Sequence, residues 1–371
     1  MTHYIKAYPL GNADSTLFKL SSGKNILFDY AAMKTEEVND GRCDLAAELN
    51  KDVEADFFDV VGFTHADMDH VKGFADYFYL QHATKYQAGN RKKINDLWVP
   101  AQVILEEGCE DETKILRAEA RYRLRSKKDI KVFSKPSKLK DWLSKEGIPF
   151  DDVKHLIVDA GQMVPGWDDS NDEVGFFAHA PFALSSNGED INRNDACLII
   201  QATFTNVPQT QFLLLADADW QLLHEIVVLS ERFENQYRLA WDIIHISHHC
   251  SYLSLSPEKG KEVTHPVEPV KRLFEEYGKE KCILISPSWI IPDLYEDVQP
   301  PHRQAFNYYK AVAETKSGEI MVTMEFPDKI HPTPIEISVN NYGATILKTI
   351  IPQGFASDRQ PPKAGCAPRH I

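Results

Sequence analysis

The sequence FFDVVGFTHADMDHVKG occupies residues 57–73 and joins an apolar run of strand length to a polar turn. The turn carries four potential metal ligands within six residues, namely His65, Asp67, Asp69 and His70. Imidazole nitrogen together with carboxylate oxygen suits zinc, and also manganese or iron. The residues that follow, from Val71, are predicted to begin a helix. The turn is therefore predicted to bind metal.

A polar loop that happens to be rich in Asp and His is the alternative interpretation of this turn. One such residue would mean little, but the pattern His-x-Asp-x-Asp-His-x-x-Gly directly after an apolar strand is specific. Without a cation, Asp67 and Asp69 would repel each other with nothing to offset the cost. A cation between them removes this repulsion, which favours the metal site.

The pattern resembles the metal-binding signature of the metallo-β-lactamase superfamily, His-x-His-x-Asp-His. Asp67 stands where most members have the second His. This departure matches one branch, the hydrolase domain of competence-type DNA-uptake proteins and its stand-alone relatives. The resemblance covers about residues 4–325 and implies the metallo-β-lactamase fold. This is an α/β fold of the αββα type, in which two sheets pack together with helices outside.

The composition bounds the class of protein. Of 371 residues, 43% are hydrophobic and 26% are charged, which is typical of a soluble globular chain. No apolar stretch approaches the roughly 18 residues of a membrane span, and the N-terminus lacks the pattern of a signal peptide. Six cysteines without pair spacing favour reduced thiols, so we expect a cytoplasmic protein without membrane insertion. A net charge of −14 argues against broad non-specific binding of nucleic acid, but it is compatible with a locally basic groove.

The N-terminal segment is predicted to contain a hairpin of residues 16–20 and 25–28 that ends at Asp29. In the superfamily this hairpin commonly ends in an Asp beside the metal site. Asp14 and Ser15 resemble the Gly-Asp-Ser loop of the branch, which makes Asp14 a candidate for substrate binding. Simple turn chemistry is the alternative for Asp14.

Residues 103–146 form the most basic region of the chain and are predicted to be a helical insertion. Its basic side chains are Arg117, Arg121, Arg123, Arg125, Lys127, Lys128, Lys131, Lys135, Lys138 and Lys140. A solvated helical face is the commoner outcome for such a run. The alternative is a basic insertion beside the active site that holds a polyanion, with Arg121 and Arg125 as candidates for substrate binding.

Two candidate site residues follow this region. Residues 174–181 are predicted to form a strand that runs into a His-x-Pro exit, and His179 is the candidate for the superfamily's third ligand motif. A surface His at a strand end is the alternative. Residues 192–200 resemble the Asn-Asn-x-Ser-Leu-Val-Leu run of the branch, so Asn194 is a candidate for substrate binding.

Residues 212–219 predict an apolar strand that ends in carboxylates. Asp217 matches the Asp that bridges two metals in the superfamily, in its Leu-Thr-Gly-Asp pattern. Ala216 replaces the usual Gly of that pattern. Asp219 is interpreted instead as a cap for a helix that starts near Trp220.

Residues 241–251 predict another apolar strand, which ends in His248 and His249. The branch has Pro-His-His-Gly-Ser here, and Cys250 takes the Gly position. A lone His pair is more often structural, but this is the fourth strand of the chain that ends on ligand-type side chains. His248 is the preferred ligand, with His249 as the alternative.

Residues 299–306 resemble the late Gly-His-Pro motif of the branch, which precedes a final helix. His302 is therefore a candidate ligand or proton donor, and a loop His after two prolines is the alternative. In the mechanism that the resemblance implies, Asp69 orients a metal-bound hydroxide or accepts its proton. His302 or His249 then protonates the leaving group.

The resemblance implies a centre of two divalent ions, zinc or alternatively manganese. One site would use His65, Asp67 and His179. The second would use Asp69, His70 and either His248 or His302. Asp217 would bridge the ions, and a pair about 4 Å apart can stabilise the attacking and leaving oxygens together.

The predicted function is metal-dependent hydrolysis of a phosphodiester, as in a phosphodiesterase or nuclease. One alternative is a hydrolase of a small ester, thioester or lactam, and another is a metal-stabilised binding module that a partner activates. The predicted partners are nucleic acid, as substrate, and a protein of the same multi-gene system. The hydrolase domain is predicted to span residues 1–325, followed by a C-terminal β extension and Pro-rich tail at 326–371.

Overall fold

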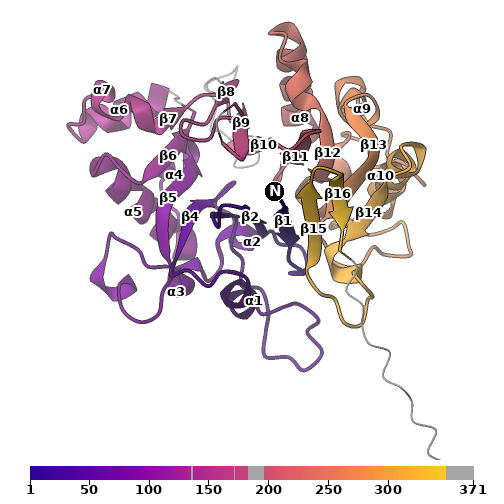
Figure 1. Ribbon diagram of the computed structural model, residues 1–371, viewed down its shortest axis with the longest axis horizontal. Coiled ribbons are helices and arrows are strands. Elements are labelled where there is room, and N and C mark those ends of the chain that lie inside the picture. Colours follow the sequence, from indigo (N-terminus) through magenta and orange to yellow (C-terminus); the bar gives the residue numbers. More distant parts are fainter. Residues whose placement is uncertain (135–136, 171, 183–195, 348–371) are drawn as a thin grey trace, which may run out of the picture.

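The computed structural model describes residues 1–134, 137–170, 172–182 and 196–347. Within these ranges the chain forms two β-sheets that pack together, with helices on their outer faces (Figure 1). The αββα arrangement expected from the sequence is therefore confirmed. None of the described helices has the length and apolar character needed to cross a bilayer.

The two sheets differ in size, and their strands follow one another in space in the order given below. The first has nine strands: β16 (Gly343–Ile346), β15 (Ile335–Asn340), β1 (His3–Ala7), β2 (Thr16–Lys19), β3 (Asn25–Phe28), β4 (Phe57–Gly62), β5 (Lys93–Pro100), β6 (Ile130–Phe133) and β7 (Ile157–Val158). The second has seven: β14 (Glu319–Val322), β13 (Gly278–Ser286), β12 (Trp241–His245), β11 (Thr210–Leu214), β10 (Ile199–Phe204), β9 (Val174–Ala180) and β8 (Gln162–Met163).

Helices cover the outer face of each sheet. On the first sheet these are α1 (Leu45–Asp52), α2 (Met68–Val71), α3 (Phe74–Tyr77), α4 (Ala101–Leu105), α5 (Asp111–Arg125), α6 (Ser137–Lys145) and α7 (Phe150–Val153). On the second sheet they are α8 (Trp220–Arg232), α9 (Glu268–Glu275) and α10 (Arg303–Thr315).

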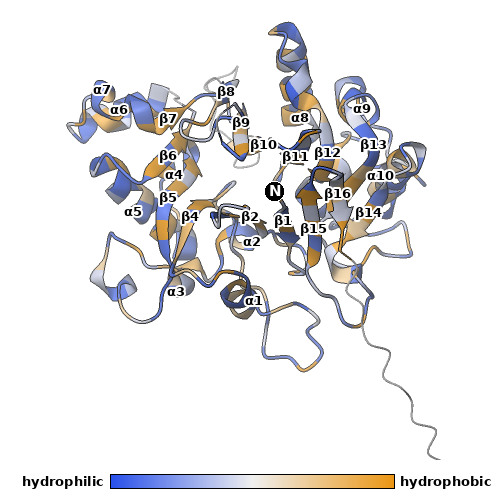
Figure 2. Cartoon of the chain, viewed as in Figure 1, coloured by the Kyte–Doolittle hydropathy of each residue, from blue (hydrophilic) through white to orange (hydrophobic). Residues whose placement is uncertain are grey.

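The apolar residues form three buried clusters, and hydrophobic residues follow the strands of both sheets in Figure 2. The central cluster lies between the sheets and contains aromatic rings from both, including Phe18, Phe28, Trp98, Phe176 and Phe212. The other two clusters lie between each sheet and its helices. Burial of apolar surface on both faces explains why the strands read as nearly continuous hydrophobic runs.

Parallel strands bring the polar strand ends to one edge. In the first sheet β3, β4 and β5 are parallel, and in the second β11, β12 and β13 are parallel. The chain leaves the C-terminal ends of β3, β4, β11 and β12 into the segments that carry Asp29, His65–His70, Asp217 and His248–His249. Side chains far apart in the sequence therefore meet where these ends converge.

The basic region at 103–146 differs from the helical insertion that the sequence predicts. It contains α5 and α6, but also β6, which pairs in parallel with β5 and β7. Leu116, Ala120 and Leu124 of α5 are buried in the cluster on the first sheet. The region is therefore built into the sheet and its helical cover, because its apolar residues complete that cover.

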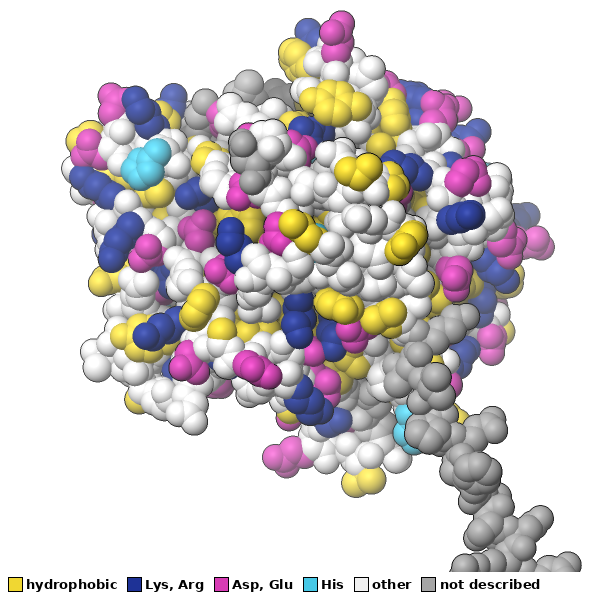
Figure 3. Space-filling view, in the orientation of Figure 1, with side chains coloured by type: hydrophobic (Ala, Val, Ile, Leu, Met, Phe, Trp, Pro, Cys, Tyr) yellow, Lys and Arg dark blue, Asp and Glu magenta, His cyan; other side chains and the backbone are white. Residues whose placement is uncertain are grey.

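The Arg side chains of α5 form ion pairs with nearby carboxylates. Arg121 contacts Glu107 at 2.8 Å, and Arg125 contacts Glu146 at 2.6 Å. Both guanidinium groups also lie over the ring of Trp142. On the face drawn in Figure 3, basic and acidic side chains are interspersed. These contacts favour the interpretation of the basic region as a solvated helical face over its interpretation as a surface that binds a polyanion.

The C-terminal strands belong to the first sheet. β15 pairs antiparallel with β1, with His3 opposite Val339, and β16 pairs with β15. The predicted C-terminal β extension therefore completes the edge of the sheet that β1 begins. The tail from residue 348 onward lies outside the described residues.

Candidate metal centre

The ligand turn after β4 is fixed by Asp29, which follows β3. The Asp29 carboxylate accepts hydrogen bonds from the backbone N–H and the hydroxyl of Thr64, both at 2.7 Å. The same carboxylate accepts a hydrogen bond from His70 Nδ1 at 2.9 Å. Asp29, Thr64 and His70 are all buried. The sequence placed Asp29 at the end of a hairpin, but only the folded chain reveals that it holds the turn at both ends.

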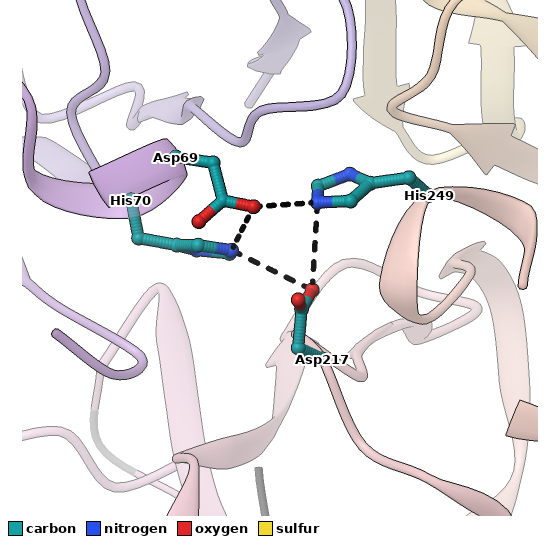
Figure 4. Close-up of side chains that lie close together, drawn as sticks. All are labelled: Asp69, His70, Asp217 and His249. Atoms are coloured by element: carbon teal, nitrogen blue, oxygen red, sulfur yellow. Dashed lines mark hydrogen bonds and ion pairs between the residues drawn. The ribbon is translucent and has the colours of Figure 1, made fainter. Parts of the chain in front are cut away.

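Four side chains from three separate segments form one group of ligand atoms within 4.8 Å of one another: Asp69, His70, Asp217 and His249 (Figure 4). Asp69 Oδ2 lies 3.1 Å from His249 Nε2. Asp217 Oδ1 lies 3.5 Å from His70 Nε2 and 3.8 Å from His249 Nε2. The end of β4, the end of β11 and the turn after β12 thus each contribute to one cluster.

A second set of side chains approaches the other oxygen of Asp217. Asp217 Oδ2 lies 3.9 Å from His65 Nε2 and 3.9 Å from His248 Nε2. His65 Nε2 also lies 3.8 Å from Asp67 Oδ2. The two oxygens of one buried carboxylate therefore face two different sets of candidate ligands.

Hydrogen bonds on the far side of two rings fix which nitrogen faces the cluster. His249 Nδ1 lies 2.8 Å from the carbonyl oxygen of Pro287, and because a carbonyl can only accept, Nδ1 carries the proton. His70 Nδ1 likewise donates to Asp29. In both residues Nε2 is left facing the cluster. Such a bond on the outer nitrogen is the arrangement found behind metal-bound histidines.

Buried polar atoms without partners mark the centre as suited to a cation. Among the described residues, no hydrogen-bond partner is found for the buried atoms His65 Nε2, His70 Nε2 and Asp217 Oδ1 of the centre. Buried polar atoms of native proteins are nearly always paired, so unpaired ones require an explanation. Divalent metals bind imidazole nitrogen and carboxylate oxygen, so the residues present fit such an ion.

The charges of the group depend on one another. Burial opposes the charged form of His249, but Asp217 and Asp69 outweigh it and raise its pKa to about 9. Burial likewise opposes charge on His70, while Asp29 and Asp69 raise its pKa well above the usual range. Asp217 is buried, yet the imidazoles of His249 and His70 hold its pKa well below normal. The positive charge of the protonated imidazoles thus balances the negative charge of the carboxylates, and a bound cation would replace these protons.

The backbone of the centre adopts left-handed conformations at residues that are not glycine. The φ angles are 46° at Ala216, 51° at His248, 52° at His249 and 66° at Cys250. In the branch that the motifs resemble, Gly occupies the positions of Ala216 and Cys250, and Gly adopts such angles without a Cβ penalty. The His248 N–H also donates to the Ala216 carbonyl at 3.0 Å, which joins the two turns. Strained backbone of this kind concentrates at functional sites.

Cys250, next to His249, is not a member of either group of clustered ligand atoms found among the described residues. Its side chain is fully buried, and burial raises the pKa of its thiol, so the thiolate that would bind metal is disfavoured.

The structure does not bring His179 to the centre. His179 is not a member of either group of clustered ligand atoms found among the described residues. Its Nε2 lies 3.1 Å from the Arg238 carbonyl, to which it donates, and its ring lines a separate pocket of about 450 Å³ beside Phe177 and Phe233. Burial lowers the pKa of His179 to about 4, so the ring is neutral near pH 7. The ring position is therefore set by the Arg238 carbonyl, after α8, instead of by the ligand turn.

His302 is held by the backbone on both sides of its ring. Nδ1 accepts a hydrogen bond from the Tyr252 N–H at 3.4 Å, and Nε2 donates to the Val298 carbonyl at 3.3 Å. The ring is buried against Tyr252. With both nitrogens occupied, His302 is not placed as a ligand or as a proton donor to a leaving group.

Asp14 lies directly behind the ligand turn. Its N–H donates to the Asp69 carbonyl at 3.1 Å, and its carboxylate lies 3.8 Å from His70 Nδ1 and 3.7 Å from His245 Nε2. Burial raises the pKa of Asp14 to about 7. His245, at the end of β12, is a buried neighbour of the centre that sequence reasoning did not single out. Asn194, the other candidate for substrate binding, lies outside the described residues.

Comparison with known proteins finds no family model and no curated protein that matches the chain. Solved structures to which it is similar include the metallo-β-lactamase fold protein YhfI from Bacillus subtilis, at 12% identity and a TM-score of 0.43, over 91% of this chain and 100% of that chain. The long form of RNase Z from yeast is similar at 12% identity and a TM-score of 0.40, over 90% of this chain and 41% of that chain.

A third similar structure is Zn(2+)-bound PqqB from Methylobacterium extorquens, at 8% identity and a TM-score of 0.33, over 86% of this chain and 97% of that chain. At these identities and TM-scores the similarities carry no conclusion about activity. The chemistry of the centre is therefore derived from its own residues, and the competence-type branch stays a prediction from the motifs.

Proposed function

We propose that this chain is a metal-dependent hydrolase that cleaves phosphodiesters at a centre of two divalent ions. The observation that carries the proposal is the position of Asp217. Its Oδ1 faces His70 and His249, and its Oδ2 faces His65 and His248, at 3.5 to 3.9 Å. A carboxylate with each oxygen turned toward a different ligand set is suited to sharing between two ions.

The ligand sets that this geometry supports differ from those implied by the sequence. One set is His65, Asp67 and His248, and the other is Asp69, His70 and His249, with Asp217 common to both. His248 thus takes the place expected for His179. The donor set of imidazole and carboxylate suits zinc, with manganese as the alternative.

When bound, two divalent ions would supply Lewis acidity and make hydroxide available near neutral pH. Asp69 has 30% of its side chain exposed, whereas His70, Asp217 and His249 are buried. Asp67 and His248 of the other ligand set are also partly exposed, so the centre opens to solvent on the side of these three residues. The Asp69 carboxylate is placed to orient a water molecule or to hold its proton.

Phosphodiesters are the proposed bond class because a pair of ions can stabilise the attacking and leaving oxygens of an in-line displacement together. Nucleic acid is the proposed form of the substrate on the strength of the branch that the motifs resemble. The second candidate is a small ester, thioester or lactam. The pairing of Arg121 and Arg125 with Glu107 and Glu146 favours it, since these cations are then less available to a polyanion.

The test is the metal content of the purified protein, followed on the same sample by hydrolysis assays with zinc or manganese. The substrates are bis(p-nitrophenyl) phosphate, p-nitrophenyl acetate, and labelled single- and double-stranded DNA and RNA. About two ions per chain with chelator-sensitive phosphodiester cleavage is the expected result. Cleavage of the acetate alone would favour the second candidate. Two ions without any cleavage would favour the binding module that a partner activates, and a protein that binds no metal would overturn the proposal.

A further inference from the structure

The segment from Trp289 to Pro300, called here the 289–300 loop, is held at both ends by one side chain. The Trp289 N–H donates to Asn12 Oδ1 at 3.1 Å, and Asn12 Nδ2 donates to the Pro300 carbonyl at 2.7 Å. Asn12 lies two residues before Asp14, whose N–H donates to the Asp69 carbonyl. The loop is thus tied through one short segment to the ligand turn.

A second connection joins the same loop to the other side of the centre. Pro287, two residues before the loop, provides the carbonyl that accepts the proton of His249 Nδ1 at 2.8 Å. Within the loop, the Val298 carbonyl accepts a hydrogen bond from His302. The loop is therefore bonded to Asn12 at both ends, and it begins two residues after the residue that bonds His249.

The surface of the loop is unusually apolar. Its exposed hydrophobic side chains are Trp289 (39%), Ile290 (39%), Leu294 (69%), Tyr295 (43%) and Val298 (85%). Met68, in the ligand turn itself, is 42% exposed. Single exposed hydrophobic residues are normal, but a concentration of them within one loop marks a binding surface.

The charges of the loop are all of one sign. It carries Asp293, Glu296 and Asp297, and no Lys or Arg. Arg303, which follows it, pairs with Asp293 at 3.1 Å. An acidic and apolar surface repels a polyanion and attracts an uncharged apolar group.

We propose that the 289–300 loop forms a wall of the substrate site and binds an uncharged apolar group, aromatic or aliphatic, on the part of the substrate that does not react. The preferred substrate is then a small phosphodiester with an apolar substituent and not a polynucleotide. This inference rests on the proposed hydrolase function and keeps its phosphodiester bond class, but it replaces nucleic acid with a small phosphodiester as the form of the substrate. The occupant is assigned to the substrate, and not to a protein, because the loop is continuous with the centre through Asn12 and Pro287.

The test compares methyl p-nitrophenyl phosphate with phenyl p-nitrophenyl phosphate. Both carry one negative charge and release the same leaving group, and any difference in their intrinsic reactivity is common to the wild type and the variants. The wild type is expected to favour the phenyl compound by about tenfold in kcat/KM, the size expected for partial burial of a ring. The double variant Leu294→Ser/Val298→Ser should reduce this preference to below about threefold, with its metal content unchanged.

Leu294 and Val298 are chosen because they are the most exposed hydrophobic side chains of the loop. Trp289 is avoided because its ring packs on Gly11 and lies under Arg42, so its loss would disturb the fold. Val207→Ser is the matched control. Val207 is 82% exposed and precedes β11, at the end of that strand opposite Asp217. It should leave the preference unchanged.

The outcomes separate the two proposals. Two results would contradict the proposed role of the 289–300 loop but not the proposed hydrolase function. One is hydrolysis of both compounds without a phenyl preference, and the other is a preference that survives in the double variant. Faster cleavage of DNA or RNA than of the phenyl compound would also contradict the proposed role of the loop. A wild-type dimer that the double variant converts to a monomer would assign the loop to an interface between copies. Absence of hydrolysis of either compound by the metal-loaded wild type would count against the proposed function itself.

Discussion

His248 and His249 are neighbours in the chain, yet their imidazole planes lie 81° apart and their ring centroids are separated by 6.2 Å. His248 Nε2 approaches Oδ2 of Asp217, and His249 Nε2 approaches Oδ1. Left-handed backbone at both residues turns the two side chains in different directions. One short turn can therefore serve both halves of a dinuclear centre.

This relationship leads to a prediction about metal content. Because each ring belongs to a different ligand set, His248→Ala and His249→Ala should each reduce the bound metal from about two ions per chain to about one. Metal content by mass spectrometry of the purified variants is the measurement. If either variant kept both ions, that ring would not be a ligand.

His179→Ala and His302→Ala provide the matched controls, since sequence motifs named both residues as ligands. Their ring nitrogens are engaged by backbone groups of Arg238, Tyr252 and Val298. Both variants should keep two ions, although each loses a buried ring and should unfold at a lower temperature. Loss of an ion from either one would restore the ligand sets that the sequence implies.

A second prediction concerns Asp217. The isosteric change Asp217→Asn removes the charge that both ligand sets share, so we expect at least about a hundredfold loss of kcat/KM, more than the loss of a supporting residue costs. Asp219→Asn is the control two residues away. The Asp219 side chain caps α8 by accepting from the Leu222 N–H at 2.9 Å, and Asn caps equally well. Equal losses of kcat/KM in the two variants would contradict the proposal that both ligand sets share the Asp217 carboxylate.

A third prediction concerns stability at low pH. Glu119 is buried and contacts Arg123 Nε at 2.7 Å and His82 Nδ1 at 2.8 Å. Burial alone would raise the pKa of Glu119, but His82 and Arg123 outweigh it and lower the pKa to about 2. Because the folded pKa lies below the usual value of 4.5, this carboxylate stabilises the fold above pH 4.5, and its contribution is lost as the pH falls toward 2.

The measurement is the free energy of unfolding of wild type and Glu119→Gln between pH 7 and pH 2.5. The difference should be about 3 kcal/mol at neutral pH and should shrink steadily below pH 4.5. Glu107→Gln is the control, since Glu107 pairs with Arg117 and Arg121 while its side chain is 75% exposed. Its effect should stay below about 1 kcal/mol. A difference for Glu119 that did not vary with pH would contradict the role of its charge.

The fold was accessible from the sequence because the polar turns that end its apolar strands carry motifs that resemble those of a known fold. Asp69, His70 and Asp217, which the motifs named as candidate ligands directly after predicted strands, lie together in one group of ligand atoms. Sequence reasoning could not decide between His248 and His249, because the left-handed backbone that separates their rings has no signature once Ala216 and Cys250 replace glycine. Such angles are set by the folded context.

Other differences between the expected and the observed structure come from long-range packing. His179 ends a strand as the motif requires, but its ring is held by the Arg238 carbonyl from a distant segment. The sequence of the basic region predicts helix throughout because the one strand within it, Ile130–Phe133, is only four residues long. Likewise, no local pattern indicates that Asn12 bonds to both ends of the 289–300 loop, since its partners lie about 280 residues away in the chain.

The last prediction concerns Asn12 as a positioning residue. Asn12→Ala removes both hydrogen bonds that close the loop, and each is worth about 1 kcal/mol. We expect KM for phenyl p-nitrophenyl phosphate to rise by about 3- to 10-fold, while kcat changes by less than about twofold, because the loop is displaced but the ligand sets are not. Asn12→Asp should be at least as harmful, since it keeps the acceptor for the Trp289 N–H but turns a negative oxygen toward the Pro300 carbonyl.

Asn206→Ala is the control for this prediction. The Asn206 amide, in the turn before β11, bonds to the Met1 carbonyl and to Asn341 at 3.3 Å, and its loss should not change KM. A fall in kcat at constant KM in Asn12→Ala would instead place Asn12 in support of the metal centre through Asp14.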